Sequence, residues 1–310
     1  MVALFGATAL GKSDVAVELS RRIGADIVVA DSMQVYAGLG IVTNQPDADS
    51  RAAARYHLVG IVPPQQEFTV AEFAERAHAV IDEVLAQGRR VIVEGGSGLY
   101  LRAALGGLEF GAPPDAEQRR LLEERWARDP DDLVAELERV APDAAARIDL
   151  RNGRRVIRAL EDAASDGPSG APPGPMARDR LWRPGERYAH RLLALSPDED
   201  RGALTARIEA RVDEMLAAGA LEEVAAARAA GPFSRTAAQA IGVRELSAVL
   251  DGELALPEAA ARMKARTRAL ARRQLTWMRK LPAAAAVPAA GRPPAAVAAD
   301  VAELLTNGSW

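Results

Sequence analysis

The sequence GATALGKS at residues 6–13 decides the first part of the fold, because it fits the pattern GxxxxGK[ST] of a phosphate-binding loop. Residues 2–5 (VALF), directly before it, form an apolar run typical of a buried strand. In residues 14–23, directly after it, Val15, Leu19 and Ile23 have the apolar spacing of a helix. A strand, a glycine loop and a helix in this order favour a phosphate site over a chance turn, because the loop amides and the helix dipole attract an anion.

The residues of this loop have separate expected roles. Gly6 and Gly11 allow the backbone to curl so that several amides point inward. Lys12 is expected to reach the outer phosphate, and the hydroxyl of Ser13 is expected to hold magnesium. The expected phosphate-binding residues are Gly6, Ala7, Thr8, Ala9, Leu10, Gly11, Lys12 and Ser13. A nucleoside triphosphate is the usual ligand of such a loop, but the pattern itself does not identify the phosphate compound.

Composition excludes several classes of site and protein. The chain has 310 residues, of which 49% are hydrophobic, and this is enough for a large packed core. It contains no cysteine, which excludes disulfides, zinc–thiolate sites and cysteine nucleophiles, and its three histidines lack metal-ligand spacing. No apolar run approaches the roughly 20 residues that span a bilayer, and the opening MVALFG does not resemble a signal peptide. We therefore expect a globular cytoplasmic protein without membrane association.

Positive charge is concentrated in two segments, although the net charge is −4. Residues 262–280 carry no acidic residue, and Lys264, Arg268 and Arg272 recur there at four-residue spacing, which places them on one stripe of a helix. The second segment contains Arg151, Arg154, Arg155 and Arg158. Such runs are often solvated faces, but two of them in an acidic chain favour a polyanionic partner.

Strand and helix patterns alternate over the first hundred residues, which is typical of a parallel sheet covered by helices on both faces. Further strands are expected at 26–30, 90–93 and 191–195. Helices are expected at 68–87, 117–126, 131–140, 152–164, 196–217, 221–230 and 258–281. The turn-forming segment 165–176 (SDGPSGAPPGPM) is expected to be a flexible loop. The pattern predicts an α/β fold, with a phosphate-loop type of parallel sheet and a helical insertion.

This pattern divides the chain into three parts. Residues 1–110 and 180–282 are expected to form a discontinuous catalytic core, and residues 111–179 a helical insertion. Residues 283–310 are rich in alanine and proline, and we expect them to form a loosely packed tail.

Two segments that follow predicted strands narrow the range of possible ligands. Asp31 opens DSMQVY (31–36), and because ligands lie beyond the carboxyl ends of parallel strands, it is expected beside the phosphate loop as a base. Alternatively, Asp31 starts a turn or caps a helix. In EGGSGLY (94–100), the glycine pair is expected to bring the backbone close to a ligand, to which Ser97 offers a hydroxyl. In RRQLTWMR (272–279), Trp277 is expected to be a core residue that seats its helix.

Together these motifs resemble the tRNA dimethylallyltransferase family, the isopentenyltransferases that prenylate an adenosine adjacent to the anticodon. The phosphate loop, DSMQVY and GGSGLY are followed in family order by NGRRVIRALE (152–161), RIEARVDEMLAAGALEEV (207–224), QAIGVREL (239–246) and RRQLTWMR. These motifs extend from residue 4 to about residue 281. Their order over most of the chain is more specific than any one of them, apart from the phosphate loop.

The resemblance implies that a dimethylallyl group moves from its diphosphate to the exocyclic amine of adenine. The loop would then hold the departing diphosphate, with Lys12 and magnesium at Ser13 stabilising its charge. Asp31 would be the general base for the amine. Ser97, where the family usually has threonine, would contact the diphosphate. The partners implied are dimethylallyl diphosphate and the tRNA anticodon stem-loop, and we expect a monomer.

The resemblance also implies a set of tRNA contacts. The adenosine must leave its stack to reach the pocket, and the residues after Asp31 would line its path. Arginines of the helical insertion and of the basic helix would grip the stem-loop. The implied tRNA-binding residues are Ser32, Met33, Gln34, Tyr36, Arg119, Arg154, Arg155, Arg158, Arg272 and Arg273.

Three positions depart from the family pattern. Gln45 stands in place of a lysine, and Gly60 ends HLVG (57–60) where the family has an aspartate. Glu94 stands where an apolar residue normally precedes the glycine pair, so it could either reach magnesium or make a local ion pair. These departures leave the reaction class unchanged but affect how the substrate is held.

Three other functions remain open on the sequence alone. A small-molecule kinase would explain the phosphate loop and the sheet, but it leaves GGSGLY and RRQLTWMR without a role. An adenylate prenyltransferase shares the chemistry, but it needs neither two arginine clusters nor a helical insertion. An RNA-binding module without activity leaves Asp31 and the phosphate loop without a function.

Overall fold

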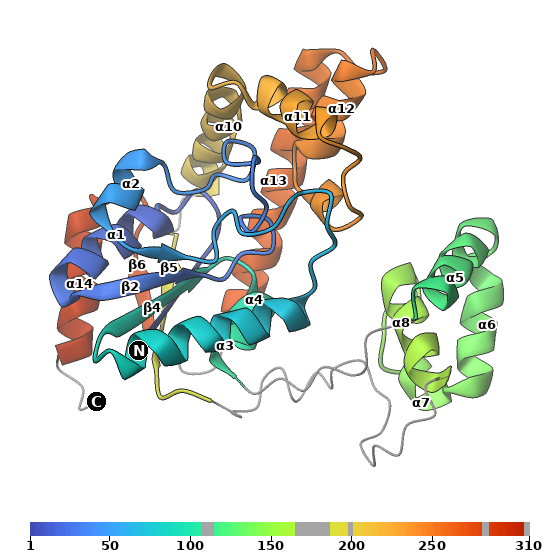
Figure 1. Ribbon diagram of the computed structural model, residues 1–310, viewed down its shortest axis with the longest axis horizontal. Coiled ribbons are helices and arrows are strands. Elements are labelled where there is room, and N and C mark those ends of the chain that lie inside the picture. The colour runs from blue at the N-terminus through green and yellow to red at the C-terminus, as the bar shows by residue number, and fades with distance from the viewer. Residues whose placement is uncertain (107–114, 165–186, 198–200, 281–284, 307–310) are drawn as a thin grey trace. The chain divides into compact units, whose positions relative to one another are not determined.

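The computed structural model describes residues 1–106, 115–164, 187–197, 201–280 and 285–306 (Figure 1). The chain folds into two compact units. The core unit comprises residues 1–107 and 186–310, and the helical unit comprises residues 108–185. The helical unit is thus inserted into the core unit, and each has its own apolar core.

The core unit is built on a six-stranded sheet in which every strand pair is parallel. The strands are β1 (Val2–Gly6), β2 (Ala25–Val29), β3 (Tyr56–His57), β4 (Arg90–Gly95), β5 (Arg191–Ser196) and β6 (Ala285–Pro288). Their order is β3-β2-β4-β1-β5-β6. Since β1, β2 and β4 are neighbours, the residues that follow them meet at one edge of the sheet. The strands β1, β2, β4 and β5 are largely buried and mostly apolar because helices cover both faces of the sheet.

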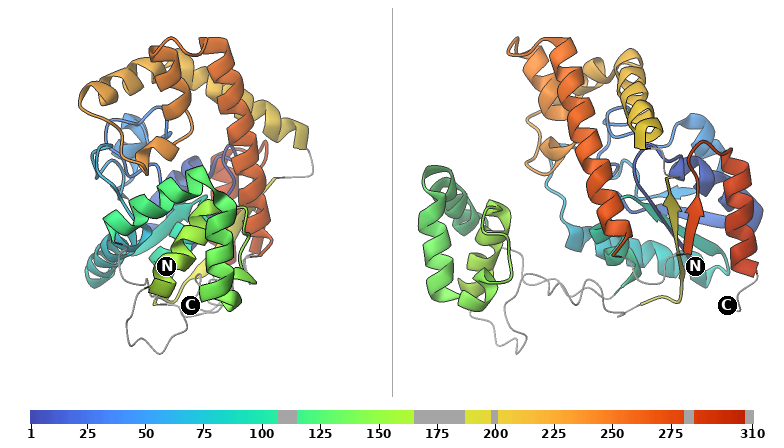
Figure 2. Two further views of the ribbon diagram at one scale, coloured as in Figure 1. Left: turned by 90° about the vertical axis from the view of Figure 1, so that its right-hand side faces the viewer. Right: turned by 180° about the vertical axis from the view of Figure 1, so that it is seen from behind.

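Two helices cover one face of the sheet, α1 (Lys12–Ile23) and α14 (Pro294–Thr306), which lie side by side (Figures 1 and 2). Val15 and Leu19 of α1 and Val297, Val301 and Leu305 of α14 are all at most 2% exposed. Together with apolar residues of five strands they form one buried cluster. Helix α1 ends at Gly24, whose φ of 65° suits glycine at this position.

The opposite face is covered by α3 (Val70–Ala86) and α4 (Gly98–Leu105), and the long helix α13 (Leu256–Met278) also reaches β1. Helix α3 begins with a capping box, in which Thr69 and Glu72 satisfy each other's backbone amides. The short helix α2 (Ala48–Ala53) follows the loop after β2.

A second helical layer of the core unit packs around α13. It contains α10 (Arg201–Ala217), α11 (Ala220–Ala229), the 3-10 helix η1 (Ala237–Gln239) and α12 (Val243–Leu250). Ion pairs join α13 to α10: Lys264 Nζ lies 2.7 Å from an Asp213 oxygen, and Arg268 pairs with Glu209. Two members of the basic stripe therefore hold helices together instead of facing a polyanion.

The helical unit contains α5 (Ala116–Arg128), α6 (Pro130–Val140), α7 (Pro142–Ala145) and α8 (Gly153–Ala164). Its core includes Leu133, Leu137 and Val156, which are fully buried. The chain leaves the core unit after α4 and returns before β5. These two points are adjacent, since the amide of Arg187 donates to the carbonyl of Leu105 at 3.1 Å.

The α/β fold class and the parallel sheet are as predicted, but the expected tail is wrong. Residues 285–288 form β6, which pairs with β5, and α14 closes the face of the sheet beside α1 (Figure 2). Strand β3, helices α2, α4, α7 and α12 and the 3-10 helix were not predicted either. The segment 165–176 lies outside the described residues. No helix in the described part of the chain is long and apolar enough to cross a membrane.

Candidate active site

The phosphate loop connects β1 to α1 at the centre of the sheet. Gly11 precedes α1 with φ of 72°, and Ala9 has φ of 64°, so the backbone turns sharply twice within three residues. The side chains of Ala7 and Leu10 are buried against Ile208 of α10 and other residues of the helical layer. Arg207 Nε donates to the carbonyl of Ala9 at 3.0 Å. The loop therefore has a strained and externally supported conformation.

Gln274 of α13 bridges this loop to the GGSG turn. Its Oε1 accepts from the amide of Thr8 at 2.8 Å, so this amide is engaged within the protein and not offered to a phosphate. A Cβ on Gly96 would lie only 2.3 Å from Gln274 Nε2, so the glycine leaves room for this side chain. Gln274 is 7% exposed and is a site residue that the sequence analysis did not single out.

The other glycines of EGGSGLY also make room for protein groups. A Cβ on Gly95 would lie 2.3 Å from the carbonyl oxygen of Ala30, and one on Gly98 would lie 2.0 Å from the ring of Trp277. The glycine pair was expected to approach a ligand, but in the structure it allows close packing of β2 and α13. Ser97 is the N-cap of α4, and its side chain makes no capping hydrogen bond. The hydroxyl is therefore not committed to the helix.

Lys12 is paired with a buried carboxylate. Its Nζ lies 3.2 Å from Oε2 of Glu94 at the end of β4. The side chain of Glu94 is 1% exposed and that of Lys12 is 14% exposed. The ion pair is thus almost fully removed from solvent, and Lys12 is held at the loop by a charge on the neighbouring strand.

Asp31 follows β2 and lies at the same edge of the sheet. Its Oδ1 accepts from the amides of Met33 at 2.8 Å and Gln34 at 3.4 Å. This turn is the predicted alternative to a role as base, and the two are compatible because Oδ2 takes no part in the turn. The turn fixes the direction of the carboxylate.

Arg211 of α10 is a further site residue that was not predicted. It is half-buried, and burial lowers its pKa while the nearby carboxylates of Asp14, Glu214 and Asp31 raise it. A guanidinium keeps its charge under these conditions, so Arg211 is a fixed cation near both the first turn of α1 and Asp31. The available signal was its position in RIEAR, four residues after Arg207 and therefore on the same side of the helix.

A family model described as IPP transferase matches residues 34–281 of the chain. The chain belongs to the IPP transferase family. It is 45% identical over 269 residues to a tRNA dimethylallyltransferase of Anaeromyxobacter dehalogenans, covering 86% of this chain and 88% of the relative. It is 42% identical over 270 residues to a tRNA dimethylallyltransferase of Nocardioides, covering 86% and 84%. As a member of the family it is an enzyme of the prenyltransferase class.

Solved structures share the fold. The full-length tRNA isopentenylpyrophosphate transferase of Bacillus halodurans superposes with a TM-score of 0.71 at 31% identity, covering 99% of this chain and 95% of that one. A eukaryotic dimethylallyltransferase acting on tRNA superposes with a TM-score of 0.76 at 23% identity, covering 100% and 80%. At 23% identity, the similarity to the eukaryotic enzyme supports a shared fold and nothing more specific.

Two departures of this IPP transferase from the family pattern meet in space. A Cβ on Gly60 would lie 3.3 Å from Oε1 of Gln45, and Gln45 Nε2 donates to the carbonyl of Tyr36 at 2.7 Å. The family resemblance implies a lysine at the first position and an aspartate at the second. The two departures together would therefore leave the local net charge unchanged.

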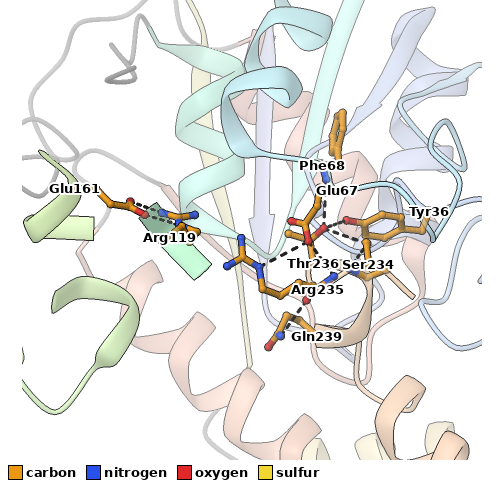
Figure 3. A network of polar contacts seen from close by, with 10 residues as sticks. Tyr36, Glu67, Phe68, Arg119, Glu161, Ser234, Arg235, Thr236 and Gln239 are labelled. Atoms are coloured by element: carbon orange, nitrogen blue, oxygen red, sulfur yellow. Dashed lines mark hydrogen bonds and ion pairs between the residues drawn. The ribbon is translucent and has the colours of Figure 1, made fainter. Parts of the chain in front are cut away.

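Tyr36 lies inside the core unit and not at an open path to the site. It is fully buried, and its hydroxyl donates to Thr236 Oγ1 at 2.6 Å (Figure 3). Burial raises the pKa of Tyr36, which keeps the phenol protonated. Thr236 Oγ1 also accepts from the amide of Phe68 at 3.2 Å. Tyr36 thus joins the DSMQVY segment to the loop before η1, whereas Ser32 and Met33 remain partly exposed.

The expected tRNA-binding arginines of the helical unit have two different environments. Arg119 makes two hydrogen bonds to Glu161, whose side chain is 2% exposed (Figure 3). Arg158 pairs with Glu161 and Asp162. Arg154 and Arg155 are exposed on α8. On α13 of the core unit, Arg272 and Arg273 are likewise exposed. The exposed arginines are the better candidates for phosphate contacts, because Arg119 and Arg158 are engaged with carboxylates.

We expect Arg119→Ala to lower the free energy of unfolding of the helical unit by about 3 kcal/mol, because it removes a bidentate partner from a buried carboxylate. Arg154→Ala should change it by less than about 0.5 kcal/mol. Thermal unfolding followed by circular dichroism checks both. Equal stability of the two variants, with weaker tRNA binding only for Arg119→Ala, would instead assign Arg119 to the RNA.

The residues at the site fit a magnesium ion brought in with a diphosphate. Ser13, in the first turn of α1, supplies a hydroxyl, and Glu94, at the end of β4, supplies a carboxylate at the same edge of the sheet. These are the hard oxygen ligands that magnesium prefers. In the described part of the chain, no three histidine, aspartate or glutamate side chains are grouped to hold a metal by themselves. Magnesium is commonly bound by few protein groups together with substrate phosphates.

Proposed function

We propose that this IPP transferase transfers a dimethylallyl group from dimethylallyl diphosphate to the exocyclic amine of the adenosine adjacent to the anticodon of a tRNA. The observation that carries the proposal is the meeting of the phosphate loop, Asp31 and Ser97 at one edge of the sheet, after β1, β2 and β4 respectively. The relatives named tRNA dimethylallyltransferases support tRNA as the acceptor.

In this proposal the phosphate loop binds a leaving group instead of a triphosphate to be cleaved. The amine nitrogen forms a bond to the allylic carbon, and the bond between that carbon and the diphosphate oxygen breaks. Its electron pair leaves with the diphosphate, where Lys12 and the loop amides other than that of Thr8 stabilise the developing charge. Magnesium bound at Ser13 would supply further charge neutralisation. Arg211 adds a third cation on the α10 side.

Asp31 acts on the acceptor. The exocyclic amine of adenine is a weak nucleophile because its lone pair is delocalised into the ring. A carboxylate within hydrogen-bond reach orients the amine and accepts its proton as the new bond forms. Oδ1 of Asp31 is used by the turn, so Oδ2 is the oxygen that takes this proton.

The acceptor is bound by exposed arginines. Recognition of an anticodon loop rests on shape, phosphate contacts and unstacked bases, and single arginines serve this purpose in an acidic protein. Arg154 and Arg155 of the helical unit and Arg272 and Arg273 of α13 are the groups that fit. A free nucleotide acceptor needs no such residues, which favours tRNA over AMP.

Radiolabelled dimethylallyl diphosphate tests the donor and the acceptor in one experiment. We expect label to enter unmodified tRNA in the presence of magnesium, and to fall to background when EDTA replaces the metal. AMP offered in place of tRNA should remain unlabelled. Label in AMP alone would assign the chain to the adenylate prenyltransferases. Transfer of phosphate from ATP to a small acceptor, with no prenyl transfer, would make it a kinase.

A further inference from the structure

A buried negative charge adjoins the lysine of the phosphate loop, where a binding site for anions would be expected to be positive. Glu94 Oε2 is 3.2 Å from Lys12 Nζ, and the Glu94 side chain is 1% exposed. The local charges of Lys12 and Glu94 therefore cancel before any ligand binds. Exposed acids near a phosphate site are screened by water, but a carboxylate as buried as this one is screened far less.

Glu94 is also held in place by the sheet. In the register of the parallel strands it lies between Leu4 of β1 and Val29 of β2, in the interior of the sheet. The carbonyl of Glu94 accepts from the amide of Ala30 at 2.6 Å, which fixes the backbone again at the strand end. The carboxylate therefore stays beside the loop when a ligand arrives.

A free diphosphate carries several negative charges. If it binds alone at the loop, it must share Lys12 with Glu94 and accept repulsion from that carboxylate at short range. A diphosphate that carries a divalent cation brings its own positive charge and offers Glu94 an attractive partner, either directly or through water. The buried carboxylate of Glu94 thus opposes binding of free diphosphate and favours binding of the diphosphate–cation complex.

We propose that Glu94 is a specificity-determining residue that makes diphosphate binding at this site conditional on a divalent cation. By cancelling the charge of Lys12, it rejects metal-free diphosphate and accepts the metal complex. An apolar residue, as the family pattern has here, leaves Lys12 uncompensated and able to bind either form. The inference rests on the proposed function only in taking the ligand to be a diphosphate.

The test measures the affinity for inorganic diphosphate by isothermal titration calorimetry, once with excess MgCl₂ and once with excess EDTA. In the wild-type protein we expect magnesium to tighten binding by about 100-fold or more, which corresponds to about 2.7 kcal/mol. Glu94→Gln keeps the size of the side chain and removes its charge. Glu94→Gln should raise the affinity for metal-free diphosphate about tenfold or more. The ratio of the affinity with MgCl₂ to the affinity with EDTA should therefore fall by at least that factor.

Two variants control for indirect effects. Glu18→Gln removes one negative charge from a partly exposed position on α1, where Glu18 pairs with Arg21, and should leave the metal dependence unchanged. Glu94→Val restores the apolar type of residue and should behave as Glu94→Gln does. Thermal unfolding of each variant confirms that the titrated protein is folded.

Each remaining outcome is decisive. The inference is overturned if folded Glu94→Gln and Glu94→Val show the wild-type ratio of affinities. It is equally overturned if they bind metal-free diphosphate more weakly, because Glu94 would then serve only to position Lys12. If the wild-type protein binds diphosphate under neither condition, the donor site of the proposed function fails as well. Label transfer to tRNA with an unchanged ratio would leave the proposed function standing and remove only the role of Glu94.

Discussion

Asp31→Asn should lower the rate of dimethylallyl transfer to tRNA by about 10²–10⁴-fold, the range over which a general base contributes to catalysis. Asparagine keeps an oxygen that can accept from the amides of Met33 and Gln34, so the turn is preserved. It cannot take a proton from the amine. The measurement is the single-turnover rate with enzyme in excess over labelled tRNA, which separates chemistry from product release.

A second aspartate provides the control for this prediction. Asp47 is exposed, and its Oδ1 accepts from the amide of Ser50 at 2.8 Å at the start of α2, so it too supports a backbone turn. Asp47→Asn should keep the wild-type rate. Binding of tRNA to Asp31→Asn should remain within a few fold of wild type, as measured by filter binding. If Asp31→Asn kept most of its rate, the proton would have to go to another group, and Asp31 would be a turn residue only.

Val301→Asp should destabilise the core unit by about 4 kcal/mol or more, because it places an unpaired carboxylate in a dry interface. Val301 is 0% exposed between α14, α1 and the sheet. For a unit of this size the loss corresponds to a fall in melting temperature of about 10 °C. Differential scanning calorimetry provides the measurement.

Leu304 gives the matched control on the same helix, since it is 39% exposed. Leu304→Asp should change the melting temperature by no more than about 2 °C. Similar melting temperatures for the two variants would mean that α14 contributes little to the core, as the sequence analysis had expected of residues 283–310.

The sequence predicted those elements whose local pattern is strong. The β1–loop–α1 unit, the strands β2, β4 and β5 and the helices α5, α6 and α8 of the insertion have clear apolar periodicity or a diagnostic glycine pattern. The pattern fails at residues 285–306, where alanine and proline dominate. Alanine gives little contrast between a buried and an exposed face, so the amphipathic signal of α14 is weak although Val297, Val301 and Leu305 are buried.

The candidate site was predicted by its motifs but not by its contacts. Lys12, Asp31 and Ser97 each follow a strand, so the order of parallel strands is enough to bring them to one edge. The bond from Gln274 to the phosphate loop joins residues 266 positions apart, and no local pattern encodes it. The same is true of the contact between Gln45 and Gly60. The glycine pair of EGGSGLY was predicted to approach a ligand, and a sequence cannot show that Ala30 and Gln274 occupy the space beside Gly95 and Gly96.

The hydrogen bond from Arg187 to Leu105 shows that the chain leaves the core unit and re-enters it at neighbouring points. The helical unit can therefore be lengthened, exchanged or removed without altering the strand order of the sheet. Such variation does not disturb the edge of the sheet at which β1, β2 and β4 end. Protein engineers can use this freedom by replacing residues 108–185 with another unit of closely spaced ends.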